Sequence, residues 1–150
     1  AVLLADDLIL NSPSCTEQLI EAYQKTSSTV IGLNKVPEEE TNKYGVISSD
    51  DIDSSLNTFQ LNDIVEKPEN NPPSNLAVVG RYILSAKIFN YLENLQPSVG
   101  GEVQLTDAIK LMLADEQVFG HIYEGQKFDC GSRHGYVQAI AHLAPGVLGE

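Results

Sequence analysis

The chain is organised around a short run near its middle, Asp63-Ile64-Val65-Glu66-Lys67-Pro68. The run indicates a strand that Pro68 stops, because proline cannot donate a ladder hydrogen bond. Glu66 and Lys67 are therefore expected at a strand end, on the rim of a sheet. A carboxylate there can accept hydrogen bonds from hydroxyls, and an ammonium can neutralise a phosphate. The alternative interpretation is a solvated pair of charges.

The amino-terminal segment predicts the first unit of an α/β fold. The apolar run Ala1-Val2-Leu3-Leu4 indicates a buried parallel strand. Asp6 and Asp7 follow at its carboxyl end, where ligands gather in open α/β sheets. A helix to about Thr26 and a strand over residues 29–33 come next, so we expect a βαβ unit with a right-handed crossover.

Local patterns place the helix of this unit. Ser14 and Glu17 match a capping box at its start. Leu19, Ile20 and Tyr23 are expected on one face.

Further elements follow the central run. Residues 76–84 are apolar almost throughout, as in a strand covered on both faces, and Gly80 in their interior marks a bulge or a close approach, with a ligand as one candidate. Residues 118–123 and 126–129 predict a closing hairpin around Glu124-Gly125. A last helix is expected to end at Pro145-Gly146.

Two polar or glycine-rich stretches interrupt these elements. Residues 50–55 are expected to form a solvated turn rather than a calcium loop, because they lack that motif's glycine and terminal glutamate. Gly100-Gly101 is expected to break the chain before a helix from Gln104 to about Asp115, whose apolar stripe belongs to the core.

Composition limits the classes of function. The chain has 150 residues, the size of one domain, and a net charge of -12 from nine basic and 21 acidic residues. That balance argues against a nucleic-acid partner and against an anionic membrane surface, both of which need a basic patch. A phosphate-binding role would need local cations, either a lysine or a metal ion held by carboxylates.

The cysteines and the apolar runs bear on the compartment. Cys15 and Cys130 lack metal-ligand spacing and are expected to be free thiols in a reducing cytoplasm. No apolar run approaches the roughly 20 residues that span a bilayer.

Several stretches, in this order, resemble the bacterial UTP–glucose-1-phosphate uridylyltransferases, also called UDP-glucose pyrophosphorylases. The resemblance covers nearly the whole chain. It is carried by Leu4-Ala5-Asp6-Asp7, Ile64-Val65-Glu66-Lys67-Pro68, Ser74-Asn75-Leu76-Ala77-Val78-Val79-Gly80-Arg81-Tyr82, Gly101-Glu102-Val103-Gln104-Leu105-Thr106-Asp107-Ala108-Ile109, Phe128-Asp129-Cys130-Gly131 and Gly135-Tyr136.

The resemblance implies an α/β fold, part of a Rossmann-like mixed-sheet nucleotidyltransferase. Members of that family open with a glycine-rich nucleotide loop of the pattern Gly-x-Gly-Thr-Arg, and no such motif occurs here. The first residue falls about where the family's mid-sheet strand would be. We therefore expect residues 1–150 to be the carboxyl-terminal, sugar-phosphate-binding portion of a single nucleotidyltransferase domain.

The resemblance also implies roles for particular residues. Asp6 and Asp129 match the two aspartates that ligate Mg²⁺, and Asp6 is thereby catalytic. Glu66 matches the glutamate that hydrogen-bonds glucose hydroxyls, and Lys67 the lysine on the sugar phosphate, which is both substrate-binding and catalytic. Two glycines, Gly45 and Gly80, match places where backbone lies against the sugar. Without the resemblance, an aspartate at a strand end is more often a helix cap, and Asp-Cys-Gly a plain turn.

The implied reaction forms UDP-glucose and pyrophosphate from UTP and glucose 1-phosphate, with a homo-oligomer expected for the full-length enzyme. These 150 residues alone are expected to be inactive. Two alternatives stay open at this point. One is a sugar-phosphate-binding or oligomerisation module without catalysis, and the other is a related nucleotidyltransferase with another base or sugar.

Overall fold

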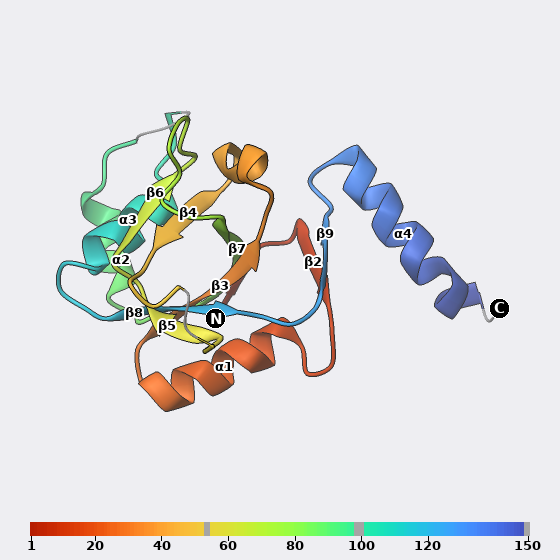
Figure 1. Ribbon diagram of the computed structural model, residues 1–150, viewed down its shortest axis with the longest axis horizontal. Helices are drawn as coiled ribbons and strands as arrows, with labels where there is room; N and C mark the ends of the chain where they lie inside the picture. Colours follow the sequence, from red (N-terminus) through yellow and green to blue (C-terminus); the bar gives the residue numbers. More distant parts are fainter. Residues whose placement is uncertain (53–54, 98–100, 149–150) are drawn as a thin grey trace.

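A mixed β-sheet with helices on both faces forms the body of the molecule in the computed structural model (Figure 1), which describes residues 1–52, 55–97 and 101–148. The strand order is β5-β8-β3-β7-β4-β6. Their bounds are Thr58–Gln60, Val118–Ile122, Thr29–Lys35, Leu76–Ile83, Gly45–Ser48 and Asp63–Glu66, respectively. β3 and β8 are parallel, and the other neighbours in this order pair antiparallel. The expected α/β mixed sheet is confirmed.

Parts of two expected loops lie outside the described residues. These are Asp53 and Ser54 of the turn at 50–55, and Gly100 of the Gly100-Gly101 break. Of the described part of the turn, Asp50, Asp51 and Ser55 are exposed, as expected, whereas Ile52 is half-buried against the core.

Strand β7 is the centre of the sheet, and two strands share one of its edges. The short strand β1, Val2–Leu3, pairs antiparallel with Tyr82 and Arg81 at the carboxyl end of β7. β4 pairs with Ala77 near the amino end of β7. The stretch of β7 between these two pairings is where β1 and β4 part.

The prediction of a buried parallel strand at residues 1–4 is wrong. Val2 and Leu3 are 37% and 54% exposed, and their strand is antiparallel to its partner. An apolar run is ambiguous between a central strand and a rim strand, and here it lies at the rim of the sheet.

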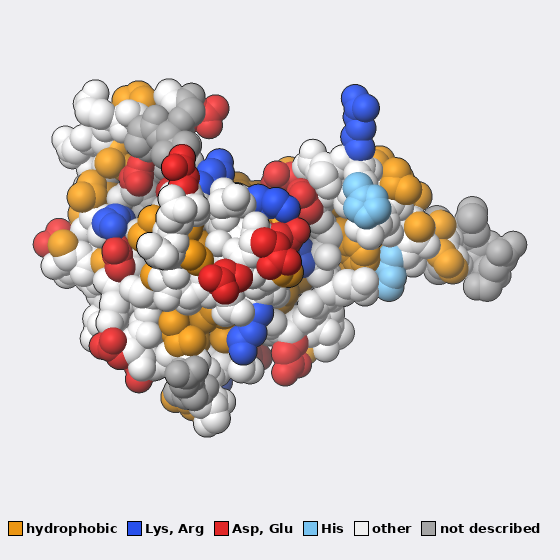
Figure 2. All heavy atoms as spheres, turned by 45° about the horizontal axis from the view of Figure 1, so that its top comes forward, with side chains coloured by type: hydrophobic (Ala, Val, Ile, Leu, Met, Phe, Trp, Pro, Cys, Tyr) orange, Lys and Arg blue, Asp and Glu red, His pale blue; other side chains and the backbone are white. Residues whose placement is uncertain are grey.

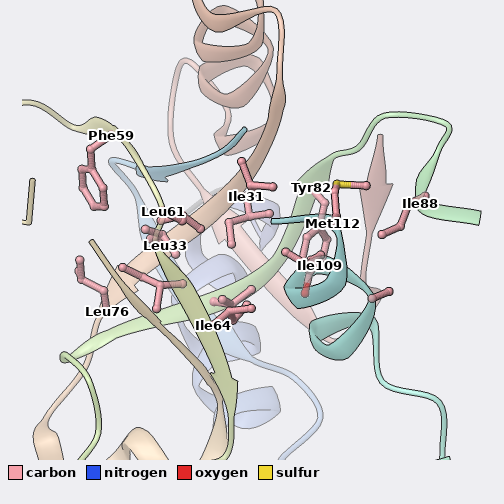
Figure 3. Packing of buried hydrophobic residues seen from close by; sticks show 14 residues of the cluster. Ile31, Leu33, Phe59, Leu61, Ile64, Leu76, Tyr82, Ile88, Ile109 and Met112 are labelled. Atoms are coloured by element: carbon pink, nitrogen blue, oxygen red, sulfur yellow. The ribbon is translucent and has the colours of Figure 1, made fainter. Parts of the chain in front are cut away.

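Helices cover the two faces of the sheet. α1, Cys15–Thr26, packs on β3 and β7 through Cys15, Leu19 and Ala22. α2, Ile88–Asn94, and α3, Leu105–Met112, pack on the opposite side. Figure 3 shows Ile88, Ile109 and Met112 from these helices meeting strand residues such as Ile31 and Tyr82. A 3₁₀ helix, Glu38–Lys43, leads into β4.

The capping box of α1 is confirmed, whereas its predicted buried face is partly wrong. The Ser14 hydroxyl accepts a hydrogen bond from the Glu17 amide, and the Glu17 carboxylate accepts one from the Ser14 amide. Ile20 and Tyr23 are 39% and 41% exposed and lie beside the buried stripe rather than in it. Tertiary packing, not the apolar pattern alone, selects the face.

The predicted closing hairpin is also wrong. β8 has β3 on one edge and β5 on the other, so it has no free edge for β9, Gln126–Asp129. β9 instead crosses to a separate two-stranded ribbon with β2, Asp7–Leu10. Gly125 permits the crossing because its φ is 149° and a Cβ there would lie 3.1 Å from the Leu10 carbonyl oxygen.

The last helix, α4, spans Arg133–Leu148 and projects away from the body (Figure 1). The prediction that this helix ends at Pro145-Gly146 is wrong, because the helix continues to Leu148. Pro145 lies inside it and removes one backbone donor without ending it. Its apolar side chains are largely exposed, among them Val137 at 63% and Ile140 at 50%. Within the described residues, no helix combines the length and apolar character needed to cross a membrane.

Both cysteines are free, as predicted. Cys15 is 2% exposed, and burial raises its pKa to about 11, with a smaller contribution from the nearby Asp7 carboxylate. Cys130 is only half-buried. Because the thiolate is the reactive form, the two thiols should differ sharply in reactivity.

We expect a thiol reagent such as 5,5′-dithiobis(2-nitrobenzoate) to modify Cys130 much faster than Cys15 in the native protein at pH 8. Cys130→Ser should abolish the fast phase, and mild denaturant should then release the slow one. Equal rates at the two thiols in the native protein would contradict the burial of Cys15.

Ile64→Ala should lower the free energy of unfolding by about 2–5 kcal/mol, because Ile64 is 0% exposed in the main core and its strand carries Glu66. Ile140→Ala is the matched control and should change it by less than about 1 kcal/mol, since Ile140 is 50% exposed. Urea unfolding followed by circular dichroism measures both. Similar losses in the two variants would contradict this packing.

Candidate functional site

A cavity of about 450 Å³ opens beside β7 where β4 and β1 part. This volume is in the range of small-ligand sites. All six residues assigned roles from the sequence line it: Asp6, Gly45, Glu66, Lys67, Gly80 and Asp129. They come from five separate stretches of chain, so the fold brings together what the sequence keeps far apart.

Glu66 and Lys67 lie at the end of β6, as predicted. Their charged atoms are 3.7 Å apart, with the Glu66 side chain 12% exposed and the Lys67 side chain 46% exposed. Lys67 has a φ of 44°, and its amide donates to the Tyr44 carbonyl oxygen at 2.9 Å. This left-handed turn ends the strand and leaves the ammonium at the cavity with only a loose ion pair.

The two site glycines adjoin functional side chains. A Cβ on Gly45 would lie 3.3 Å from a Glu66 carboxylate oxygen and 3.2 Å from the Thr106 hydroxyl. A Cβ on Gly80 would overlap Leu4 at 2.5 Å and meet an Asp7 carboxylate oxygen at 3.0 Å. The close approach expected at Gly80 is thus made by the chain itself, and contact of either glycine with a sugar stays a prediction.

Asp6 and Asp129 lie side by side at the end of the β2–β9 ribbon. The Cys130 amide donates to the Asp6 carbonyl oxygen at 2.7 Å, and the Gly131 amide donates to the Asp129 carboxylate at 3.1 Å. A Cβ on Gly131 would lie 3.1 Å from an Asp6 carboxylate oxygen and 3.2 Å from one of Asp129. Gly131 therefore leaves open the space beside which the two carboxylates meet.

This pair fits a Mg²⁺ ion of the kind that keeps most of its waters. Mg²⁺ is usually bound through one or two carboxylates together with substrate phosphates, and not by a complete protein cage. Both carboxylates are exposed at the cavity, with no third ligating group close enough to form a cluster in the described part of the chain.

A second, more buried ion pair lies behind these carboxylates. Lys127 Nζ is 2.9 Å from an Asp7 carboxylate oxygen, and each side chain is 13% exposed. The other Asp7 oxygen accepts a hydrogen bond from the Gly80 amide at 2.7 Å. Lys127 Nζ also lies 4.9 Å from the centroid of the Tyr44 ring, a cation–π distance.

Lysines differ in how available they are for a phosphate in this cavity. Lys127 is held by Asp7, and Lys43 is 3.0 Å from Glu40 on the 3₁₀ helix. Lys67 has the longest ion-pair distance of the three. Figure 2 shows acidic and basic side chains mixed across the middle of this face, and mainly apolar ones along the projecting arm. The cavity lining thus combines carboxylates with lysines in a strongly acidic chain.

Tyr82 adds a neutral polar group to the cavity wall. Its side chain is 7% exposed, and burial raises its pKa, with further contributions from the carboxylates of Asp7 and Glu66. The phenol therefore stays protonated over the physiological range and can donate a hydrogen bond.

Sequence reasoning missed Asp7, Lys127, Tyr44, Tyr82 and Thr106 as cavity residues. The sequence does contain a signal for Lys127. Lys127 and Asp129 are two residues apart on one predicted strand and so share a face. Asp7 was placed at the strand end beside Asp6 but received no role. The others lie next to β4, on β7 and on α3, and they reach the cavity through tertiary packing that no local pattern reveals.

Comparisons with known proteins show the family to which the chain belongs. Residues 1–145 match the family model described as nucleotidyl transferase. The UTP–glucose-1-phosphate uridylyltransferase of Pseudomonas aeruginosa is 44% identical over 142 residues, which are 93% of this chain and 50% of that protein. The enzyme of the same name from Bacillus subtilis is 42% identical over 145 residues, 96% of this chain and 49% of that protein.

Solved structures show the same fold. A UDP-glucose pyrophosphorylase complexed with UDP-glucose superposes with a TM-score of 0.89 at 35% identity, covering 96% of this chain and 55% of that one. A UTP-bound enzyme from Acinetobacter baumannii gives a TM-score of 0.79 at 35% identity, covering 96% and 50%. The chain spans about half the length of the relatives that it matches. It belongs to the nucleotidyl transferase family and is related, over that half, to UDP-glucose pyrophosphorylase.

Proposed function

We propose that the whole protein forms UDP-glucose and pyrophosphate from UTP and glucose 1-phosphate, and that these residues supply its sugar-phosphate site and metal carboxylates. The observation that carries the proposal is the convergence of Glu66, Lys67, Asp6 and Asp129 on one cavity. Hydroxyl acceptors, a phosphate-neutralising ammonium and a carboxylate pair are the groups that a sugar phosphate and its cation require.

The chemistry asks for positioning more than for proton transfer. An oxygen of glucose 1-phosphate would attack the α-phosphorus of UTP in line, and pyrophosphate would leave. The nucleophile is already an ionised phosphate, so no general base is needed. Much of the barrier comes from bringing two anions together, and positive charges held in place by the protein lower that barrier. Lys67 is suited to the sugar phosphate because its own ion pair is loose, and Glu66 is suited to orient the sugar through its hydroxyls.

A Mg²⁺ ion held by Asp6 and Asp129 would neutralise phosphate charge as it develops. The protein's own part is to keep the two carboxylates together at the cavity. The Cys130 and Gly131 amide hydrogen bonds and the open space beside Gly131 support this role.

We further propose that the chain corresponds to the carboxyl-terminal, sugar-phosphate-binding portion of the enzyme. Two findings support this: the order of the matching motifs and the lack of a Gly-x-Gly-Thr-Arg run in these residues. The nucleotide would then be held largely by the other portion. Comparing UTP with dTTP as substrates of the whole protein would separate the proposed UDP-glucose synthesis from the reaction of a related nucleotidyltransferase. A strong preference for dTTP would overturn the proposed use of UTP. Cytoplasmic location and a homo-oligomeric state stay predictions.

Lys67→Ala should weaken binding of glucose 1-phosphate to this chain by about tenfold or more, since a charge-assisted contact is lost. The melting temperature should change by less than about 2 °C, because the side chain is 46% exposed. Calorimetric titration with and without Mg²⁺ measures the first, and a thermal melt the second. The control is Lys25→Ala, an exposed lysine that does not line the cavity. A large loss of stability in Lys67→Ala, or unchanged affinity, would contradict the assignment.

Asp6→Asn and Asp129→Asn should each weaken Mn²⁺ binding, with Mn²⁺ as the paramagnetic stand-in for Mg²⁺, by about tenfold, because each replaces a charged ligand by a neutral one. Electron paramagnetic resonance of free Mn²⁺ gives the affinity. Asp50→Asn, on an exposed turn, is the control and should have no effect. Equal affinity in the wild type and both cavity variants would remove these carboxylates from the metal site.

A further inference from the structure

The ion pair between Asp7 and Lys127 is much more buried than the ion pair between Lys110 and Asp63. Its two side chains are 13% exposed, whereas the Lys110–Asp63 pair, of similar length at 3.0 Å, is 50% and 43% exposed. Withdrawing two charges from water is costly unless their remaining bonds are satisfied. Here Asp7 also accepts from the Gly80 amide at 2.7 Å, and Lys127 lies over the Tyr44 ring.

Each member of this pair is close in sequence to one of the exposed carboxylates. Asp7 follows Asp6 directly, and Lys127 precedes Asp129 by two residues on the same face of β9. Asp7 and Asp129 are opposite each other in the β2–β9 ladder, so the pair bridges the strands diagonally. The ion pair therefore fixes the two strands next to the point where Asp6 and Asp129 emerge.

The pair also ties the ribbon to the main sheet. Gly80 belongs to β7, and its amide bonds to the Asp7 carboxylate. The Arg81 guanidinium adds hydrogen bonds to the backbone carbonyl oxygens of Leu4 and Gly80, at 3.0 and 2.8 Å, and to that of Asp7. Movement of the ribbon relative to β7 would break the hydrogen bonds of Asp7 with Gly80 and Arg81 together, and it would carry Asp6 and Asp129 away from the rest of the cavity.

We propose that Asp7 and Lys127 are positioning residues: their ion pair sets the spacing of the Asp6 and Asp129 carboxylates and so determines cation affinity without touching the cation. This inference rests on the proposed metal site. Supporting residues around metal ligands commonly change affinity by about 10–100-fold when they are replaced.

Electrostatics alone makes the opposite prediction for Lys127. Removing a positive charge next to a cation site, and freeing the Asp7 carboxylate, should tighten Mn²⁺ binding if charge were the only effect. If the pair sets the geometry, the same change should weaken binding. The sign of the change in affinity therefore separates a positioning role from a purely electrostatic one.

The test is Mn²⁺ titration of the 150-residue chain, followed by electron paramagnetic resonance, for the wild type and for Lys127→Met. The matched control is Lys110→Met, which breaks the exposed Lys110–Asp63 pair. We expect Lys127→Met to weaken binding by about tenfold and the control to leave it unchanged. Titrations run well below each variant's melting temperature keep a loss of stability from entering the affinity.

Unchanged or tighter binding in folded Lys127→Met, with Asp6→Asn still weakened, would overturn the positioning role and leave the metal site standing. If the wild type itself binds no Mn²⁺, the metal site fails and this inference fails with it. Should Lys127→Met not fold, the double variant Asp7→Asn/Lys127→Met leaves no unpaired buried charge and replaces it in the titration. Binding as tight as wild type in that variant would overturn the inference, and about tenfold weaker binding would support it.

Discussion

The carboxylate of Asp7 is the contact on which the arrangement of the cavity depends. One oxygen accepts from the Gly80 amide of the main sheet, and the other pairs with Lys127 of the two-stranded ribbon. Two sheets that share no ladder are thereby held at a fixed distance. The main sheet contributes Glu66 and Gly45 to the cavity, and the ribbon contributes Asp129. This link acts together with the Arg81 hydrogen bond to the Asp7 carbonyl oxygen and with the β1–β7 pairing just upstream of the ribbon.

Charge balance explains how a chain of net charge -12 can offer a site for anions. Most of the excess acid is spread over loops and helix surfaces, and the cavity instead combines carboxylates with three lysines. Two of those lysines are committed to partners, at 2.9 Å to Asp7 and 3.0 Å to Glu40. Lys67 remains available for a phosphate because its ion pair with Glu66 is long, at 3.7 Å, and composition does not reveal this. Net charge argues against a nucleic-acid surface, but it does not locate the group that would meet a phosphate.

Local sequence patterns predicted the helices and strands better than they predicted which elements pair or pack with one another. The Ser14–Glu17 capping box and the strand ending at Glu66 depend on residues within one turn or one strand, and both are confirmed. The hairpin at Glu124-Gly125 failed because whether β8 and β9 pair depends on β3 and β5, which already occupy both edges of β8. Similarly, the buried face of α1 follows from the strands beneath it. The candidate site residues were assigned through a resemblance, whereas Asp7 and Lys127 received no role because they are distant from each other in sequence.

Glycines shape this cavity in a way that differs from the usual expectation of a ligand approaching bare backbone. The space that a side chain would take at Gly80 holds Leu4 and Asp7, and at Gly45 it holds Thr106 and Glu66. At Gly131 it lies between Asp6 and Asp129. In each case one of the neighbours within 3.3 Å is the carboxylate of a residue that lines the cavity. The missing Cβ therefore lets acidic side chains come close to the backbone, where amides can bond to them, as at Gly80 and Gly131. The glycines thus shape the cavity through the carboxylates for which they leave room.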